Sequence, residues 1–196
     1  MRSPHLQKKI SWLQSKGFLI NDCDAVEDAY PDFINLLYDF RDIFAYSPTD
    51  LTERNLLECN IITDPNAKPC RSRPYRLNDE MRHRVDKQLD ELLASGVITE
   101  DDGSPFASPI VMVRKKTRDW RFCVDMRNLN VISISLYHDL PVLDDIIDVV
   151  TRNKAKVISV CDLKSAYHQL KLTQQSSYKT AFVTPHRGGY RYLRLP

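Results

Sequence analysis

The sequence predicts an α+β fold, in which helices and antiparallel strands occupy separate stretches of the chain. Three observations lead to this prediction. They are a capped amphipathic helix near the middle of the chain, a β-hairpin pattern after it, and a second pair of strand-like runs near the C-terminus. A hydrophobic fraction of 42% over 196 residues is enough to form a core.

The N-terminal third is predicted to be mostly irregular, with one short helix. Pro31 suits the first turn of that helix. Four apolar residues then recur at helical spacing and predict its buried face: Phe33, Leu36, Leu37 and Phe40. Prolines interrupt the pattern in 47–73, where only 57–63 resembles a strand. We therefore expect residues 47–73 to form an extended connector.

The clearest helical pattern follows this connector. Asn78 can cap the helix, Asp79 and Glu80 suit its first turn, and Gly96 can end it. Five apolar residues share one face of this helix: Met81, Val85, Leu89, Leu92 and Leu93.

The remaining elements are strands and one further helix. Residues 110–113 and 120–126 predict a hairpin with a basic turn over 114–119. Asp144 and Asp145 suit the start of a helix over 143–150. Three further strands are expected, the last two around a turn at Gly188-Gly189: 156–161, 179–184 and 190–195.

Charge and cysteine content narrow the class of protein. Residues 152–196 contain nine Lys or Arg and a single acid, Asp162. Such a stretch is compatible with a phosphate-binding surface or with a solvated basic face, and for a charge cluster alone the second is commoner. Five cysteines without Cys-x-x-Cys spacing indicate reduced thiols in an intracellular protein. No apolar run reaches the length of a membrane span.

Asp162 is the candidate catalytic residue. It follows the predicted strand 156–161 directly, where the chain turns toward a possible helix. This arrangement places a carboxylate beside free backbone N–H groups, a pairing that nucleotidyl transfer needs for divalent metals and triphosphate oxygens. By itself the pattern is more often a helix N-cap.

A set of ordered motifs is more specific. With its spacing, this set resembles reverse transcriptases of gypsy-type LTR retrotransposons over residues 74–196. The motifs are Pro74-Tyr75-Arg76-Leu77, Glu91-Leu92-Leu93 to Gly96-Val97-Ile98, Ser104-Pro105-Phe106-Ala107-Ser108-Pro109, Arg121-Phe122-Cys123-Val124-Asp125-Met126-Arg127-Asn128-Leu129-Asn130, Asp162-Leu163-Lys164-Ser165-Ala166-Tyr167-His168-Gln169 and Lys179-Thr180-Ala181-Phe182. Upstream, Asp42-Ile43-Phe44-Ala45 and Ile61-Ile62-Thr63 resemble the protease-to-polymerase connector of these polyproteins.

The resemblance implies a role for each matching residue. Asp162 corresponds to the first metal-binding aspartate of the palm, with the carbonyl of Leu163 as a further ligand of Mg²⁺ in a two-metal site. The incoming deoxynucleoside triphosphate would be bound by Lys115 and Arg121 on the hairpin and by the amides of Ser165 and Ala166, and Tyr167 would pack under its sugar. Arg127 and Asn130 would contact the RNA or DNA template.

The resemblance also implies a domain order and a cellular location. Residues 1–73 correspond to the connector, 74–161 to the fingers subdomain and the entry to the palm, and 162–196 to a partial palm. Elements of this type copy RNA in cytoplasmic virus-like particles, without a membrane partner. The hairpin turn at Thr117-Arg118-Asp119 lacks the glycine that is usual in the family.

The Tyr-x-Asp-Asp segment that carries the other two catalytic aspartates does not occur in this sequence. The first hypothesis is therefore a fragment of an RNA-directed DNA polymerase that is inactive alone. The alternatives are a non-catalytic nucleic-acid-binding remnant and a silent product of a decayed element. In a palm without its central strands, four apolar residues are expected to lack partners: Phe182, Tyr190, Tyr192 and Leu195.

Overall fold

The computed structural model describes residues 3–20, 29–46, 54–116, 119–135, 142–152 and 160–196. For residues 54–56 it describes the backbone only. The chain divides into two compact units, Met1–Leu51 and Thr52–Pro196. The helical elements, in chain order, are α1 (Pro4–Ser15), α2 (Tyr30–Asp39), η2 (Arg41–Ile43), α3 (Asp79–Ala94), α4 (Arg127–Ile132), α5 (Leu143–Arg152), η4 (Ala166–Gln169) and α6 (Gln174–Lys179). The strands are β1 (Arg54–Cys59), β2 (Ile98–Glu100), β3 (Ser108–Arg114), β4 (Trp120–Val124), β5 (Leu170–Leu172), β6 (Phe182–Thr184) and β7 (Gly188–Tyr192).

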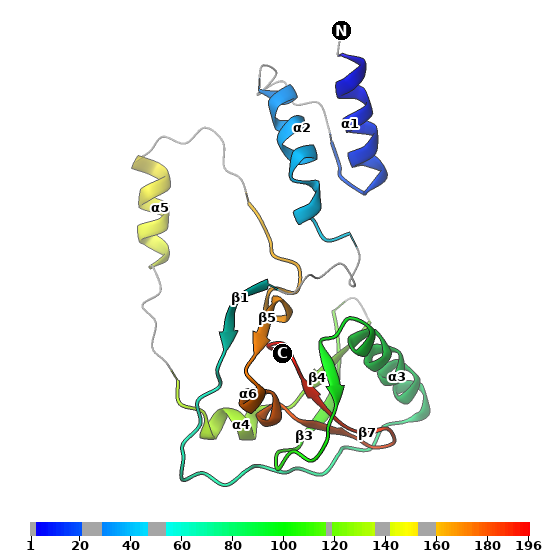
Figure 1. Ribbon diagram of the computed structural model, residues 1–196, viewed down its shortest axis with the longest axis vertical. Coiled ribbons are helices and arrows are strands. Elements are labelled where there is room, and N and C mark those ends of the chain that lie inside the picture. Colours follow the sequence, from blue (N-terminus) through cyan, green and yellow to red (C-terminus); the bar gives the residue numbers. More distant parts are fainter. Residues whose placement is uncertain (1–2, 21–28, 47–53, 117–118, 136–141, 153–159) are drawn as a thin grey trace. The chain divides into compact units, whose positions relative to one another are not determined.

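The first unit is a pair of helices, α1 and α2, that lie side by side (Figure 1). The hydroxyl of Ser3 caps α1 by accepting a hydrogen bond from the amide of Leu6 at 3.3 Å. Leu6, Leu13 and Ile34 form the buried core of this pair. The sequence-based expectation of a mostly irregular N-terminal third therefore missed α1.

The predicted helix at Pro31 is confirmed as α2, but of its predicted buried face only Leu37 packs against the core. Ile34 is fully buried against α1, with Tyr30 and Leu37 packed beside it. Phe33, Leu36 and Phe40 are about half exposed. Helical spacing allows either stripe, and only the position of α1 selects the one that is buried.

The second unit is built on a five-stranded sheet in the order β2-β7-β6-β3-β4. The predicted hairpin is confirmed as β3 and β4, which pair from Ile110 with Val124 to Arg114 with Trp120. Strand β6 adds parallel to β3 through Ser108 and Phe182, and the other pairs are antiparallel. The sheet is thus mixed, whereas the sequence predicted antiparallel strands.

Helix α3 covers this sheet, and its predicted ends are confirmed. The Asn78 side chain accepts a hydrogen bond from the amide of Met81 at 2.8 Å, and Gly96 follows the helix with a φ of +64°. Val85 and Leu89 are fully buried in the core with Phe182, Tyr190 and Tyr192 among others.

The C-terminal strands join the β3–β4 hairpin in one sheet, and this corrects the expectation that their apolar residues lack partners. Phe182, Tyr190 and Tyr192 are buried, and Leu195 is partly buried against the same core. The physical reason is the parallel pairing of β6 with β3, which brings these residues under α3. Residues 174–179 form α6, whose start is capped by Thr173, so the first C-terminal strand begins at Phe182 instead of at 179.

Two further expectations concern β1 and the strand before Asp162. The strand predicted over 57–63 is only partly confirmed, because β1 ends at Cys59 and pairs parallel to β5, while Thr63 makes only an isolated bridge with Ser133. Most of the strand predicted over 156–161 lies outside the described residues, and Val160 and Cys161 are not in a strand.

Helix α5 confirms the prediction over 143–150, with Asp144 and Asp145 in its first turn. None of the described helices is long and apolar enough to cross a membrane.

Candidate nucleotide and nucleic-acid interface

The tip of the β3–β4 hairpin carries the predicted phosphate-binding residues. Register pairing places Val113 opposite Arg121, and the amide of Lys115 donates to the carbonyl of Asp119 at 2.7 Å to close the turn. Arg114, Lys116 and Arg121 have no ion-pair partner in the described part of the chain. Three free cations at one hairpin end therefore attract anions.

One pocket of about 450 Å³ brings the hairpin next to the C-terminal part of the chain. Lys115 and Arg121 line it together with His168, which belongs to η4. The ring nitrogen Nδ1 of His168 lies 3.1 Å from the carbonyl oxygen of Leu195, which holds η4 against the chain end. Two of the predicted phosphate-binding residues thus share a cavity with the segment that follows Tyr167.

The loop that precedes η4 contains the other predicted residues. Asp162, Leu163, Ser165 and Tyr167 are exposed and Ala166 is partly buried, and none of the five lines this pocket. The carboxylate of Asp162 has no hydrogen bond or ion pair with another described residue.

Ser165 adopts a left-handed backbone conformation, with a φ of 48° and a ψ of 49°. Within the described residues it is the only residue other than glycine with a positive φ. Its amide and that of Ala166 donate to no acceptor within the described segments. Strained backbone of this kind concentrates at ligand-binding loops.

A divalent metal at Asp162 would require further metal-binding side chains close to it. Two-metal phosphoryl transfer needs several carboxylates around metals about 3.5–4 Å apart. The described residues include no group of three or more His, Cys, Asp or Glu that could hold a metal ion. Asp162 and the Leu163 carbonyl therefore do not make a complete two-metal centre.

The predicted template-binding residues lie on α4. Arg127 forms a bidentate pair with Asp125, with Nε to Oδ1 at 2.8 Å and Nη2 to Oδ2 at 2.6 Å. This hydrogen bonding holds the pKa of Asp125 below its usual range, and partial burial of the carboxylate opposes the shift. The Arg127 side chain is 81% exposed, and Asn130 is also exposed.

Comparisons with known proteins identify the family. No protein-family model matches the chain. A retrovirus-related Pol polyprotein from transposon opus of Drosophila melanogaster is 32% identical over 197 residues, which cover 96% of this chain and 19% of the polyprotein. The corresponding polyprotein from transposon 297 of the same species is 31% identical over 166 residues, covering 82% of this chain and 15% of that protein. The chain belongs to the retrovirus-related Pol polyprotein family.

Solved structures show which part of a Pol polyprotein this fold corresponds to. Prototype foamy virus protease-reverse transcriptase matches 100% of this chain and 25% of its own, with a TM-score of 0.70 and 22% identity. A foamy viral protease-reverse transcriptase in complex with an RNA/DNA hybrid matches with a TM-score of 0.69 and 21% identity. The fold of this Pol segment is therefore that of a reverse transcriptase. The chain spans about a fifth or less of the length of the curated polyproteins named above.

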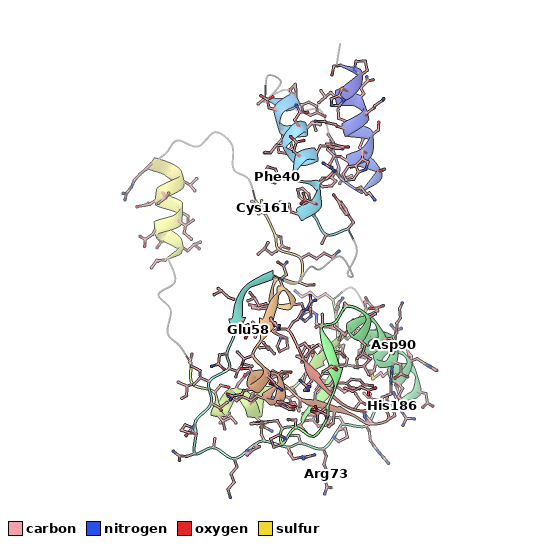
Figure 2. The ribbon with its side chains drawn as sticks, viewed as in Figure 1. Phe40, Glu58, Arg73, Asp90, Cys161 and His186 are labelled. Carbon is pink, nitrogen blue, oxygen red and sulfur yellow. The ribbon has the colours of Figure 1, made fainter. Side chains whose placement is uncertain are left out.

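The basic C-terminal stretch of this Pol segment is not a free basic face. Four of its cations pair with carboxylates from earlier in the chain: Arg152 with Asp148 at 3.0 Å, Lys171 with Glu58 at 3.8 Å, Arg187 with Asp90 at 2.7 Å and Arg191 with Asp102 at 3.5 Å. Figure 2 shows Asp90 and His186 on the side of the unit where α3 meets the β6–β7 turn. Part of the local charge excess is therefore neutralised, and three of these four pairs link separate parts of the fold.

Two residues near the hairpin were not singled out from the sequence. His168 stood inside a family motif but received no role, although it lines the pocket. Asp119 was noted only as part of a turn without glycine, yet its carboxylate lies 3.9 Å from Lys115 and 3.9 Å from Arg84 of α3. The contact to Arg84 crosses between two elements, so no local pattern could have predicted it.

Proposed function

We propose that this chain provides the fingers and the first catalytic aspartate of an RNA-directed DNA polymerase, and that it binds nucleotide and template phosphates through the β3–β4 hairpin. The observation that carries the proposal is the shared pocket of Lys115, Arg121 and His168. Cations directed at a transferring phosphoryl group stabilise the charge on its oxygens. Membership of the Pol polyprotein family and the reverse-transcriptase fold favour nucleotidyl transfer over other phosphate chemistry.

The remaining roles follow the resemblance residue by residue. The unpaired amides of Ser165 and Ala166 would bind triphosphate oxygens, and Tyr167 would pack under the sugar and exclude a 2′-hydroxyl. Arg127 and Asn130, both exposed on α4, would contact the template. Magnesium at Asp162 and the Leu163 carbonyl would need further carboxylates from outside the described residues.

The proposal includes the division of the chain and its place in the cell. Residues 1–73 would be the connector, 74–161 the fingers and palm entry, and 162–196 the start of the palm. The parent polyprotein would act in cytoplasmic virus-like particles, with template–primer and deoxynucleoside triphosphates as its partners.

A salt titration of binding to a labelled template–primer tests the hairpin. We expect sequence-independent binding that weakens with salt, and each neutralised phosphate adds about 0.9 to the slope of log affinity against log salt on duplex DNA. Arg121→Gln should remove one phosphate contact and so reduce the magnitude of this slope by about 0.9. Lys171→Gln is the matched control, since Lys171 pairs with Glu58 far from the hairpin in sequence. Equal slopes for wild type and Arg121→Gln would contradict the proposal.

A non-catalytic nucleic-acid-binding protein is the second candidate. It is favoured by the lone carboxylate at Asp162 and by the free cations Arg114, Lys116 and Arg121. It predicts the same salt dependence, but Asp162→Asn should then leave binding of nucleotide and metal unchanged. A silent product of a decayed element would show neither salt-dependent nucleic-acid binding nor binding of nucleotide and metal.

A further inference from the structure

The carboxylate of Asp119 lies between two cations at the hairpin turn. Its Oδ2 is 3.9 Å from Nζ of Lys115, and its Oδ1 is 3.9 Å from Nη1 of Arg84 on α3. Oδ1 also accepts a hydrogen bond from the amide of Trp120 at 2.9 Å. Asp119 thus pairs with the same amine that the proposed function assigns to phosphate.

Lys115 stands between two hollows of the surface. One is the pocket that it shares with Arg121 and His168, and the other is a smaller one of about 220 Å³ between α3 and the hairpin. Asp119 and Arg84 line only the smaller one. The ion pair with Asp119 therefore engages the Lys115 amine on the side of the smaller hollow, next to α3.

We infer that Asp119 is an internal counter-ion that competes with phosphate for Lys115, and that it sets the affinity of the hairpin for phosphate ligands. This inference rests on the proposed phosphate-binding role of Lys115. It adds a positioning residue that acts through Lys115 and does not itself touch the ligand.

The geometry of the pair means that Lys115 can leave Asp119 at a small cost in free energy. At 3.9 Å, with side chains 42% and 62% exposed, the Lys115–Asp119 contact is a weak ion pair. When Lys115 leaves, Asp119 keeps Arg84 and the amide of Trp120 as partners. No buried charge is left without a partner, so an incoming phosphate can displace the carboxylate.

Asp119→Asn in the full chain is the test, because the amide oxygen can still accept from Trp120 while the charge is lost. Two readouts are measured: the rate at which a sulfonated succinimidyl ester, an anionic reagent, modifies Lys115, followed by mass spectrometry, and the affinity for inorganic tripolyphosphate at low salt. Both should rise about two- to fivefold, the range expected for removing one exposed ion-pair partner. The gain in affinity should vanish in Lys115→Gln/Asp119→Asn.

Glu58→Gln is the matched control, since Glu58 pairs with Lys171 at 3.8 Å with similar exposure and carries the same charge. Equal gains from Glu58→Gln and Asp119→Asn would overturn the inference in favour of a net-charge effect. An unchanged rate of Lys115 modification in Asp119→Asn would also overturn the inference, even if the affinity for tripolyphosphate rises. Failure of the proposed function has a different signature, because Lys115→Gln alone would then leave tripolyphosphate affinity unchanged.

Discussion

At the scale of single residues, the pairing of Arg127 with Asp125 links pH to the stability of α4. The two parallel hydrogen bonds lower the pKa of Asp125, so its carboxylate is stabilised in the folded protein. A carboxyl group with a depressed folded pKa contributes stability above its unfolded pKa. That contribution is lost as pH falls through the folded pKa.

We predict that Arg127→Gln raises the pKa of Asp125 toward its ordinary range. The variant should be less stable than wild type at neutral pH, and the difference should disappear below the folded pKa of Asp125. Carboxyl NMR titration and urea unfolding at several pH values would measure both effects. Asn130→Ala on the same helix should leave the pKa of Asp125 where it is; a shift of similar size in that variant would assign the effect to α4 as a whole.

Ser165 is the other informative single residue. A left-handed conformation costs a residue with a Cβ on the order of 1 kcal/mol or more relative to glycine, and the surrounding chain must supply this energy. The conformation leaves the amides of Ser165 and Ala166 without acceptors in the described segments, which suits the proposed binding of triphosphate oxygens.

At the scale of elements, α3 connects the β3–β4 hairpin with the C-terminal strands. Its buried face supplies Val85 and Leu89 to the core. Its exposed side supplies Asp86 and Asp90, which bind the β6–β7 turn through His186 at 2.8 Å and Arg187 at 2.7 Å. One helix therefore uses hydrophobic burial and ion pairing to hold segments about a hundred residues apart.

The Arg187 contact yields a prediction that separates folding from binding. Arg187→Gln should lower the free energy of unfolding by about 0.5–1 kcal/mol, because the pair is partly exposed and screened. It should leave the salt slope for template–primer binding unchanged, unlike Arg121→Gln. Chemical unfolding and the salt titration would measure the two quantities. Arg82→Gln, which removes an exposed pair within α3, serves as the control.

If Arg187→Gln weakens template–primer binding as much as Arg121→Gln does, the basic C-terminal stretch binds nucleic acid directly. The structural role of the β6–β7 turn would then be secondary.

At the scale of the whole molecule, the sheet closes a core within this chain. The pairing of β6 with β3 buries Phe182 and Tyr190 beneath α3. The predicted metal site is not closed in the same way, because Asp162 is exposed and no cluster of metal ligands forms among the described residues. Folding and catalysis therefore make different demands on the chain.

We predict that this chain alone will not extend a primer. Mg²⁺ prefers six oxygen ligands and loses its water reluctantly. A two-metal centre therefore needs several carboxylates to hold the ions, and Asp162 supplies only one. Primer extension on an RNA template, with millimolar Mg²⁺ or Mn²⁺, should give no product above that of Asp162→Asn. Extension that depends on Asp162 would mean that acids elsewhere, or in a second copy, complete the metal site.

Several local elements and the family could be predicted from the sequence. Asn78 and Gly96 predicted the ends of α3, two strand-like runs around a basic turn predicted the β3–β4 hairpin, and the ordered motifs indicated a reverse transcriptase. These signals are local, because caps, turns and periodicity depend on residues only a few positions apart.

Only the tertiary structure decided how those elements combine. Neither the buried stripe of α2 nor the parallel pairing of β6 with β3 follows from a local pattern. The neutralisation of Arg187 by Asp90 and the approach of Asp119 to Arg84 were equally hidden. Burial and ion pairing depend on partners that are distant in sequence, so they are settled only when the chain has folded.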